Sequence, residues 1–310
     1  MSLVVRVGSA ARAPWWRDTL QSLLPEVDVR LWDDPGDRSK VEYAVVWQPP
    51  PGGLKTFPNL KVIVSMGAGI DHVLRDPELP RHLPIIRTVG PDLRQRMREY
   101  VLLHVLRLHR RLPETEASFR RKEWNQLITP VAPERPVGVL GLGNMGADSA
   151  SHLAHIGFEV HGWSRRPKNV AGVICHSGAE GLERLLKRAE ILVCLLPLTP
   201  QTTGILNKQL FAKLPEGACL INAGRGQHLV EEDLIPALDS GQLDGATLDV
   251  LQVEPAAEDH PFWTHPKVLL TPHTASLIDP EVGSRLIAAN LKLFMAGKPV
   301  PDMVDVAQGY

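Results

Sequence analysis

Residues 137–146, with the sequence VGVLGLGNMG, carry an apolar run directly into the pattern Gly-x-Gly-x-x-Gly. In a dinucleotide fold the first glycine permits a tight turn, the second lets a pyrophosphate approach the backbone, and the third lets a helix pack closely on a strand. Residues 147–156 can form that helix, whose first amide groups would face the phosphates. The predicted coenzyme-binding residues of this turn are Gly141, Leu142, Gly143, Asn144, Met145 and Gly146.

A glycine turn can bind a nucleotide or be purely structural, and the residues around the turn decide between these two interpretations. The strand before it, the helix after it and a second apolar strand at residues 159–163 fall where nucleotide binding requires them. That second strand leads into Ser164, Arg165 and Arg166. An acid at this place would bond the ribose 2′-hydroxyl of NAD, whereas arginine forms charge-assisted hydrogen bonds with the 2′-phosphate of NADP. We therefore predict a preference for NADP(H), with NAD(H) still possible; the alternative is a basic surface turn.

Short apolar strands alternate with helical stretches along most of the chain. Before the glycine turn, strands are predicted at residues 3–7, 27–32, 43–47, 62–65 and 85–88, with a first helix at 13–24. After it, strands are predicted at residues 159–163, 191–196, 218–221, 245–248 and 268–270, with a last helix at 280–296. Alternation of this kind predicts parallel strands joined by crossover helices.

The sequence thus predicts an α/β fold of two doubly wound, parallel-sheet domains of the Rossmann type. Because the last helix follows the final strand of the second domain, that domain is expected to be inserted into the first. The first domain is predicted to span residues 1–96 and to be completed by 278–310, and the dinucleotide-binding domain to span 97–277. A helix at residues 93–111 is apolar over most of its circumference, which predicts burial in a core or an interface.

Composition narrows the class of protein. The chain has 310 residues and a formal net charge of −1, so it offers no basic excess for nucleic acid or for an anionic membrane. Its three cysteines are widely spaced, which predicts reduced thiols and no metal site. The apolar run in MSLVVRVGSA is too short for a signal peptide, and no later stretch approaches a membrane span. We therefore expect a soluble, cytoplasmic protein.

Three charged residues follow three predicted strands of the second domain. Arg225 lies in NAGRG, Glu254 in DVLQVEP and His273 in TPHTAS. In an open parallel sheet, residues beyond the carboxyl ends of the strands converge on the ligand crevice. Arginine offers a planar fork to a carboxylate, histidine can transfer a proton near neutral pH, and a carboxylate bonded to that histidine fixes its tautomer. Singly, each has a structural alternative: a surface ion pair, a turn before proline and a satisfied core histidine.

The motifs GLGNMG, NAGRG, DVLQVEP and TPHTAS resemble the successive signatures of the D-2-hydroxyacid dehydrogenase family. The similarity extends over nearly the whole chain, because SMGAGIDHV resembles the substrate loop of that family and EYV the start of its interdomain helix. The stretches VVWQPPPG, FPNLKVIVSMGAGIDHV and MREYVLLHVLRLHR are similar to its glyoxylate/hydroxypyruvate reductase A branch. Related formate dehydrogenases carry glutamine in place of Glu254, so formate oxidation is not expected.

The resemblance implies a role for each matching residue. Arg225 would bind the substrate carboxylate and carbonyl, His273 would protonate the ketone oxygen as hydride arrives, and Glu254 would orient His273. The implied substrate contacts in the first domain are Trp47, Met66, Gly67, Ala68 and Gly69, with a core tryptophan as the alternative for Trp47. Besides Arg225 and His273, the further implied coenzyme contacts are Leu195, Pro197, Thr202, Ala223, Ala275 and, on the nicotinamide side, Asp249.

The implied activity is NADPH-dependent reduction of small 2-oxoacids, glyoxylate to glycolate and hydroxypyruvate to D-glycerate. The resemblance also implies a homodimer that pairs through the helix at 93–111, with a buried helix within one domain as the alternative. Trp124 would lie on an arm exchanged between subunits. Two other functions remain open: a dehydrogenase for a bulkier 2-oxoacid such as phenylpyruvate, and a non-catalytic binding protein that senses dinucleotides. The lack of disordered tails and of a basic patch argues against the second.

Overall fold

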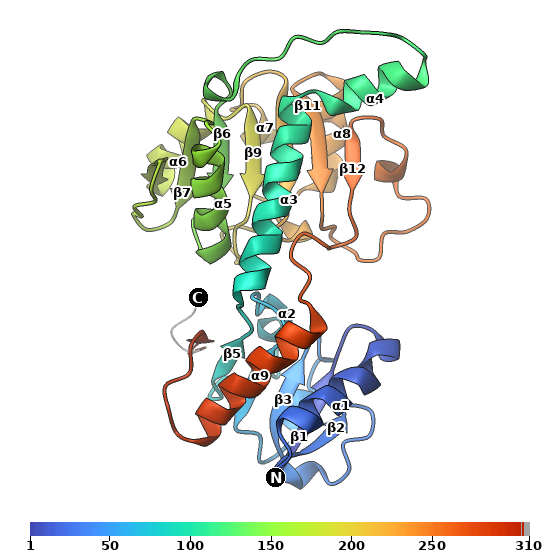
Figure 1. Ribbon diagram of the computed structural model, residues 1–310, viewed down its shortest axis with the longest axis vertical. Coiled ribbons are helices and arrows are strands. Elements are labelled where there is room, and N and C mark those ends of the chain that lie inside the picture. Colours follow the sequence, from blue (N-terminus) through green and yellow to red (C-terminus); the bar gives the residue numbers. More distant parts are fainter. Residues whose placement is uncertain (305, 307–310) are drawn as a thin grey trace. The chain divides into compact units, whose positions relative to one another are not determined.

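The computed structural model describes residues 1–304 and 306, which form two compact units (Figure 1). The first unit combines residues 1–93 with the described residues from 278 onward, and the second contains residues 94–277. The chain therefore leaves the first unit and returns to it, which confirms the insertion predicted from the sequence. Residues 305 and 307–310, at the end of the predicted segment 278–310, lie outside the described residues.

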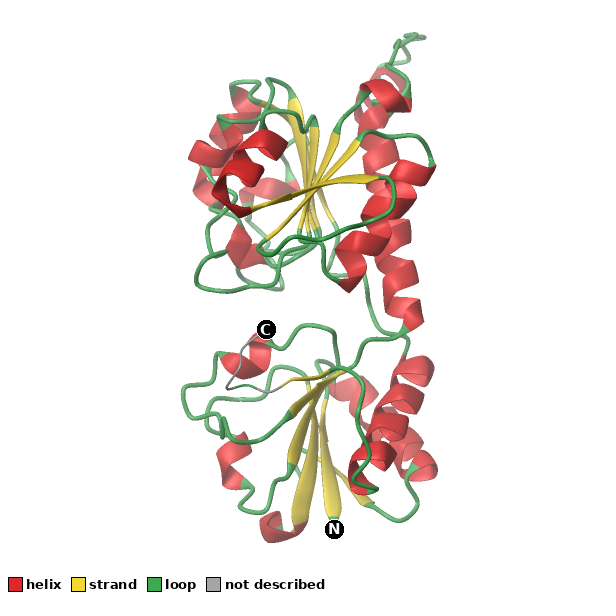
Figure 2. Cartoon of the chain, turned by 90° about the vertical axis from the view of Figure 1, so that its left-hand side faces the viewer, coloured by secondary structure: helices red, strands yellow, loops and turns green. Residues whose placement is uncertain are grey.

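The first unit is built around a twisted sheet (Figure 2). The described strands of this sheet follow the order β13-β5-β4-β3-β1-β2. Five of these strands are parallel, and β13 runs antiparallel beside β5. The strand order reverses between β1 and β3, and doubly wound folds bind ligands beyond the carboxyl ends of the strands at such a point. The strands are β1 (Ser2–Arg6), β2 (Asp28–Leu31), β3 (Val41–Val46), β4 (Val62–Ser65), β5 (Ile85–Arg87) and β13 (Met303–Val304).

Apolar side chains alternate between the two faces of this first sheet. On β1, Leu3 packs on the face that α1 and α9 cover, whereas Val4 packs on the opposite face. Ile287 of α9 is fully buried in the same cluster as Leu3. Burial of an aliphatic side chain of this size contributes about 1.5–3 kcal/mol, so the returning C-terminal helix is a structural part of the first unit. The helices of this unit are α1 (Ala13–Leu23), α2 (Asp71–Leu74) and α9 (Pro280–Met295).

The second unit is built around a parallel sheet whose described strands follow the order β12-β11-β10-β9-β6-β7-β8 (Figure 1). The chain starts in the middle of this sheet with β6, moves outward to β8 and returns to the other side of β6 with β9. The reversal between β6 and β9 is where a dinucleotide fold binds its ligand. The strands are β6 (Val137–Leu140), β7 (Val160–Ser164), β8 (Val173–Ser177), β9 (Ile191–Cys194), β10 (Ala218–Asn222), β11 (Leu243–Leu248) and β12 (Val268–Leu270).

Helices cover both faces of this second sheet (Figure 1). Ile191 and Val193 of β9 share a buried cluster with α3 and α5, whereas Leu192 and Cys194 share one with α6, α7 and α8. Strands buried on both faces are typical of doubly wound folds, so the predicted fold class is confirmed. The helices are α3 (Pro91–His109), α4 (Leu112–Arg120), α5 (Asn144–His155), α6 (Gly178–Leu186), α7 (Lys208–Phe211) and α8 (Glu231–Asp239).

Some elements lack a strong signal in the sequence. β8 lies at the edge of its sheet, where its residues are half-buried or exposed and no continuous apolar run is needed. β13 has two residues, too few for a recognisable alternation. The predicted helix at 93–111 is α3, but Leu103 and Leu106 on it are exposed, so part of its apolar surface is not covered within its own unit.

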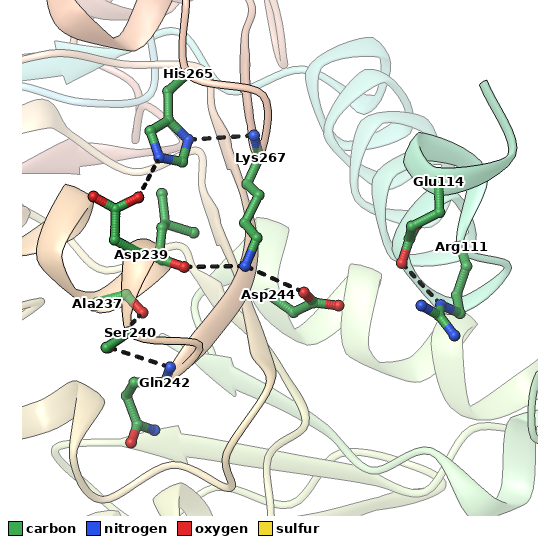
Figure 3. A network of polar contacts seen from close by, with 10 residues as sticks. Arg111, Glu114, Ala237, Asp239, Ser240, Gln242, Asp244, His265 and Lys267 are labelled. Atoms are coloured by element: carbon green, nitrogen blue, oxygen red, sulfur yellow. Dashed lines mark hydrogen bonds and ion pairs between the residues drawn. The ribbon is translucent and has the colours of Figure 1, made fainter. Parts of the chain in front are cut away.

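A polar network ties β11 and β12 to the end of α8 (Figure 3). His265 Nε2 lies 3.3 Å from Asp239 Oδ1, and His265 Nδ1 accepts from the amide of Lys267 at 3.2 Å. Lys267 Nζ donates to the carbonyl of Leu238 at 3.0 Å and lies 3.5 Å from Asp244 Oδ1. Because Lys267 precedes β12 and Asp244 is the second residue of β11, this network joins the amino ends of the strands and belongs to the scaffold.

Candidate active site

The glycine turn joins β6 to α5, and the three glycines of the turn have different surroundings in the structure. Gly141 has a φ of +101°, a left-handed value that favours glycine. A Cβ at Gly146 would lie 1.8 Å from the carbonyl oxygen of Gly141, so no side chain fits between turn and helix. A Cβ at Gly143 would meet nothing within 4 Å. The turn is therefore closed at Gly146 and open at Gly143.

The first turn of α5 can receive an anion. Gly143 is the N-cap of this helix, and no side chain caps it. No acidic residue lies in the first turn, and the amino end of a helix carries a partial positive charge. Gly143 and Asn144 are exposed and Met145 is half-buried, whereas Leu142 points into the core and offers its main chain alone.

β7 ends at Ser164, and two arginines follow it in an exposed turn. The Ser164 hydroxyl donates to the carbonyl of Arg166 at 2.7 Å, so Ser164 shapes the turn. Within residues 1–304 and 306, the guanidinium groups of Arg165 and Arg166 form no hydrogen bond or ion pair. Exposed cations of this kind are suited to a phosphate ligand.

The loop after β9 faces the glycine turn at the point where the strand order reverses. A Cβ at Gly141 would lie 2.6 Å from the carbonyl oxygen of Leu195, so the two backbones are in close contact. Thr202 Oγ1 donates to the carbonyl of Pro197 at 2.7 Å and accepts from the amide of Thr199 at 2.8 Å. Of the predicted coenzyme contacts here, Thr202 thus has its hydroxyl engaged within the loop, while Leu195 is half-buried and Pro197 is exposed.

Arg225 follows β10, and its backbone is held on both sides by buried side chains. Its amide donates to Nδ1 of His228 at 3.0 Å, and its carbonyl accepts from Nδ2 of Asn222 at 3.1 Å. Its guanidinium donates to the carbonyl of Gly224 at 2.7 Å. Ala223, the predicted coenzyme contact in this loop, is buried beside them. The side chains of Asn222 and His228 therefore hold the backbone of Arg225 in place without a ligand.

Glu254 and His273 lie in the loops after β11 and β12. His273 Nδ1 is 2.7 Å from Glu254 Oε2, and the amide of Leu251 donates to Glu254 Oε1 at 3.0 Å. A Cβ at Gly226 would lie 1.9 Å from the carbonyl carbon of Leu251, so the Arg225 loop touches the Glu254 loop through its backbone. Burial alone raises the pKa of Glu254, but the hydrogen bond and charge of His273 and the charge of Arg225 bring that pKa below its ordinary value. Glu254 is therefore an anion at neutral pH.

The buried carboxylate of Asp249 organises the loop that carries His273. It accepts from the amides of Thr274 at 2.8 Å and Ala275 at 2.9 Å and from Thr271 Oγ1 at 2.6 Å. His273 has a φ of +53°, which is uncommon for a residue with a Cβ, and its amide donates to the Asp249 carbonyl at 2.9 Å. Asp249 thus holds the backbone of this loop, and its predicted place on the nicotinamide side stays a prediction.

Three residues that support the site were not predicted from the sequence. Tyr100 Oη lies 2.8 Å from Thr271 Oγ1, which connects the loop of His273 to α3. Asn222 and His228 are fully buried and hold Arg225. Their places three residues before and three residues after Arg225 were the only signal that the sequence offered.

In the first unit, Met66 to Gly69 form the predicted substrate loop after β4. The Met66 side chain is buried in the core, whereas Gly67, Ala68 and Gly69 are half-buried and can present main-chain groups. Ser65 Oγ lies 2.8 Å from the carbonyl of Gly69 and accepts from the amide of Gly67 at 3.3 Å. The loop is therefore closed around the Ser65 hydroxyl.

Trp47 lies against this loop at the end of β3. A Cβ at Gly67 would be 3.1 Å from the indole, and the ring centroids of Trp47 and His72 are 4.6 Å apart. His72 is buried, accepts from the amide of Gln48 through Nδ1 at 3.1 Å and places Nε2 3.0 Å from Ser65 Oγ. The structure thus brings Trp47 together with the predicted substrate loop.

Among the described residues, the structure gives no sign of a reactive thiol at Cys194 or Cys219, or of a metal site. Cys194 and Cys219 are buried thiols, and burial raises the pKa of each to about 12, so both stay protonated. In the part of the chain that the structure describes, no cluster of three or more His, Cys, Asp or Glu side chains could hold a metal ion. None of the helices in that part has the length and apolar character that crossing a membrane requires.

Comparison with known proteins finds relatives that match this chain in sequence and in fold. The sequence profile of the NAD binding domain of the D-isomer specific 2-hydroxyacid dehydrogenases matches residues 102–275. The glyoxylate/hydroxypyruvate reductase A of Serratia proteamaculans (strain 568) is 42% identical over 300 residues, which cover 95% of this chain and 96% of that protein.

Two solved structures match along the full chain. A D-isomer specific 2-hydroxyacid dehydrogenase from Xanthobacter autotrophicus Py2, in complex with NADPH and MES, has a TM-score of 0.92 at 41% identity and covers 100% of this chain and 99% of that one. The NADPH-dependent glyoxylate/hydroxypyruvate reductase from Sinorhizobium meliloti, in complex with NADP and sulfate, has a TM-score of 0.92 at 39% identity and covers 100% of both chains.

The fold and the loops around its glycine turn define an oxidoreductase of the two-domain, dinucleotide-binding class. Because the profile covers more than half of the sequence and the relatives match nearly all of it, the chain belongs to the D-isomer specific 2-hydroxyacid dehydrogenase family. The resemblance drawn from the four motifs is confirmed, and so is the similarity to the glyoxylate/hydroxypyruvate reductase A branch.

Proposed function

We propose that this enzyme reduces small 2-oxoacids with NADPH and that glyoxylate and hydroxypyruvate are its preferred substrates. The observation that carries the proposal is the 2.7 Å contact between His273 Nδ1 and Glu254 Oε2, in loops adjoining that of Arg225. A proton donor and a carboxylate-binding group beyond neighbouring strands of a dinucleotide fold are suited to adding hydride and proton to an oxoacid carbonyl. The names of the relatives support the same assignment.

The glycine turn fits the pyrophosphate of a dinucleotide. The open space at Gly143 leaves room for it, and the uncapped amino end of α5 supplies amide donors. Arg165 and Arg166 would bind the 2′-phosphate that distinguishes NADP(H) from NAD(H). The relatives solved with NADPH and with NADP support this choice of coenzyme.

In the proposed mechanism, Arg225 holds the substrate carboxylate and so orients the carbonyl for reaction. When bound, NADPH would supply the hydride for the carbonyl carbon, so that the oxoacid would be reduced to a 2-hydroxyacid and NADPH oxidised to NADP⁺. His273 donates the proton to the carbonyl oxygen from Nε2, because its Nδ1 is engaged with Glu254. Glu254 stabilises the imidazolium before this transfer and keeps the ring oriented after it. His273 is partly exposed, so solvent can return the proton.

We assign substrate binding to the predicted domain of residues 1–96 with 278–310, and coenzyme binding to residues 97–277. The loop from Met66 to Gly69 would offer main-chain donors to the substrate, and Trp47, which lies against this loop, would limit the size of the substrate. Ser65 and His72 hold that loop in a fixed shape, which supports a recognition role.

We infer that two copies of the chain pair through α3, α4 and the residues that follow. Large apolar side chains are exposed along this stretch: Leu103, Leu106, Phe119, Trp124 and Ile128. Trp124 and Ile128 are each 95% exposed, and apolar surface of this kind is typical of an interface. Light scattering should find a dimer that Trp124→Ala with Ile128→Ser weakens. A monomeric wild-type protein would contradict the inference.

The decisive experiment is a matrix of NADPH and NADH against glyoxylate, hydroxypyruvate, pyruvate and phenylpyruvate. We expect the highest kcat/KM with NADPH and either glyoxylate or hydroxypyruvate. A preference for phenylpyruvate would move the enzyme to bulkier 2-oxoacids. No NADPH oxidation with any of them, together with tight NADPH binding, would replace the proposal with a dinucleotide-sensing protein.

A further inference from the structure

His228 lies in the one-turn helix η5 (Gly226–His228), fully buried behind Arg225. Its Nδ1 accepts the backbone amide of Arg225 at 3.0 Å, and Nε2 lies 3.3 Å from the carbonyl oxygen of Pro197. A nitrogen that accepts an amide hydrogen carries no proton, so this imidazole is neutral and holds its hydrogen on Nε2. The ring therefore accepts from one loop and donates to another.

The two loops that this ring joins serve different ligands in the proposed function. Arg225 would bind the substrate carboxylate. Pro197 belongs to the loop after β9, which lies beside the glycine turn, and this loop would contact the coenzyme. The Pro197 carbonyl also accepts from Thr202 Oγ1 at 2.7 Å, so it is a shared anchor of that loop. The imidazole thus connects the substrate side of the site to its coenzyme side.

Packing leaves the ring little freedom to tilt. A Cβ at Gly224 would lie 2.9 Å from His228 Nδ1, and Cys194 Sγ lies 3.8 Å from the same nitrogen. Close packing and complete burial keep the two bonded nitrogens where they are. This geometry suits a residue that sets the position of Arg225, and not a residue that contacts a ligand itself.

We propose that His228 is a positioning residue with a separate task for each ring nitrogen. Nδ1 fixes Arg225 for the substrate carboxylate, and Nε2 fixes the Pro197 loop for the coenzyme. This proposal rests on the proposed function, because it takes Arg225 as the carboxylate-binding group.

Two substitutions separate the tasks. Asparagine places an acceptor oxygen near the position of Nδ1 and no atom near Nε2, so His228→Asn keeps the bond to Arg225 and loses the bond to Pro197. Glutamine reaches the position of Nε2 with a donor nitrogen, so His228→Gln keeps the bond to Pro197 and loses the bond to Arg225.

The expected result is a crossed pattern. His228→Gln should raise the KM for glyoxylate about tenfold with a smaller change in kcat, because carboxylate binding is lost in ground state and transition state alike. His228→Asn should instead raise the Kd for NADPH, with the KM for glyoxylate near that of the wild type. Parallel changes in both variants, or none in either, would overturn the proposal, because a merely structural histidine cannot separate the two ligands.

His265 offers a matched control. Its Nδ1 also accepts a backbone amide, that of Lys267, and its Nε2 also meets an acceptor, Asp239, but it lies at the amino ends of the strands (Figure 3). His265→Asn and His265→Gln should leave both ligand constants unchanged. Should a His228 variant not fold, Thr202→Val removes the other side-chain bond to the Pro197 carbonyl and should act like His228→Asn. An unchanged Kd for NADPH in Thr202→Val would contradict the proposed role of Nε2 in fixing the Pro197 loop for the coenzyme.

Binding of oxalate to the NADPH-loaded proteins, measured by calorimetry, makes the test independent of turnover. Oxalate offers a carboxylate to Arg225 but no ketone to reduce. If the wild type turned over no 2-oxoacid, the proposed function would fail by itself, whereas weaker oxalate binding in His228→Gln than in His228→Asn would still support the positioning role. Equal oxalate binding by the two variants would overturn it.

Discussion

A Cβ at Gly146 would lie 1.8 Å from the carbonyl oxygen of Gly141, whereas a Cβ at Gly143 would touch nothing within 4 Å. Packing therefore requires glycine at position 146, whereas at position 143 only a bound ligand would require it. Sequence spacing alone gives the two the same status. Their surroundings in the fold distinguish them.

Substituting each of these glycines should separate packing from ligand binding. Gly146→Ala drives a methyl group into backbone, which cannot move aside, so it should destabilise the second unit by about 3 kcal/mol or more. Gly143→Ala should cost at most about 1 kcal/mol, mainly as a poorer N-cap, but should raise the Kd for NADPH about tenfold. Urea unfolding and calorimetric NADPH titration check both. Equal loss of stability in the two variants would contradict the distinction.

Proton transfer by His273 is tested best with asparagine, because asparagine tolerates the left-handed backbone that His273 adopts at a φ of +53°. His273→Asn should lower kcat for glyoxylate by about 10² to 10⁴, the usual contribution of a positioned general acid. NADPH affinity should be retained, as measured by fluorescence titration. A variant that turns over at the wild-type rate would remove His273 from the mechanism.

The charge of Glu254 should matter for catalysis and, at acidic pH, for stability. Glu254→Gln keeps an acceptor for the Leu251 amide but removes the anion, so kcat/KM should fall by about 10 to 100-fold. The pKa of Glu254 is lowered in the folded protein, so its stabilising interaction is present above the ordinary value of 4.5 and is lost as the pH falls through the folded pKa.

Wild type should therefore lose stability relative to Glu254→Gln as the pH is taken below 4.5. Thermal unfolding of the two proteins at neutral and acidic pH measures this difference. A constant difference across that range would show that Glu254 carries no folding-linked charge.

The residues of the site that could be predicted are those whose signal is local. The glycine turn, Arg225, Glu254 and His273 each stand in a short motif at the end of an apolar strand, and parallel strands bring their carboxyl ends to one edge. The core strands were found for the same reason, because strands buried on both faces are apolar throughout.

The supporting residues could not be predicted, because their meaning depends on partners far away in the sequence. Tyr100 meets Thr271 across 171 residues, and the sequence around it shows only an apolar helix. His228 follows a turn and resembles any polar turn residue until the fold brings Pro197 to it. Sequence spacing predicts the groups that would touch ligands, and the fold shows the residues that hold those groups in place.

Coenzyme choice should depend on the exposed turn after β7. Replacing Arg165 and Arg166 by alanine removes two cations that have no hydrogen bond or ion pair in the described part of the chain, so folding should be unaffected. The KM for NADPH should rise at least about tenfold, with little change for NADH, because NADH has no 2′-phosphate. Arg184→Ala with Lys187→Ala, exposed residues of α6 and its end, gives a control of equal charge change. Equal increases for both coenzymes would reduce the segment to a basic surface turn.

His104 should make the protein less stable at mildly acidic pH. It is 5% exposed on α3 beside Tyr100, and within the described residues its Nδ1 has no hydrogen-bond partner. Burial, with the charge of Arg107, lowers the pKa of His104 from 6.5 to about 4. Between these values the unfolded chain binds a proton that the folded protein does not, so the free energy of unfolding falls as the pH drops from 6.5 toward 4.

His104→Leu removes this proton linkage and places an apolar side chain at the buried position. Between pH 7 and pH 5 the wild type should lose about 2 kcal/mol of unfolding free energy that the variant retains. Urea unfolding at the two pH values measures the difference, and His155→Gln, at an exposed histidine of α5, should behave like the wild type. If His104→Leu lost as much stability as the wild type on acidification, the buried imidazole would not be the group that binds the proton on unfolding.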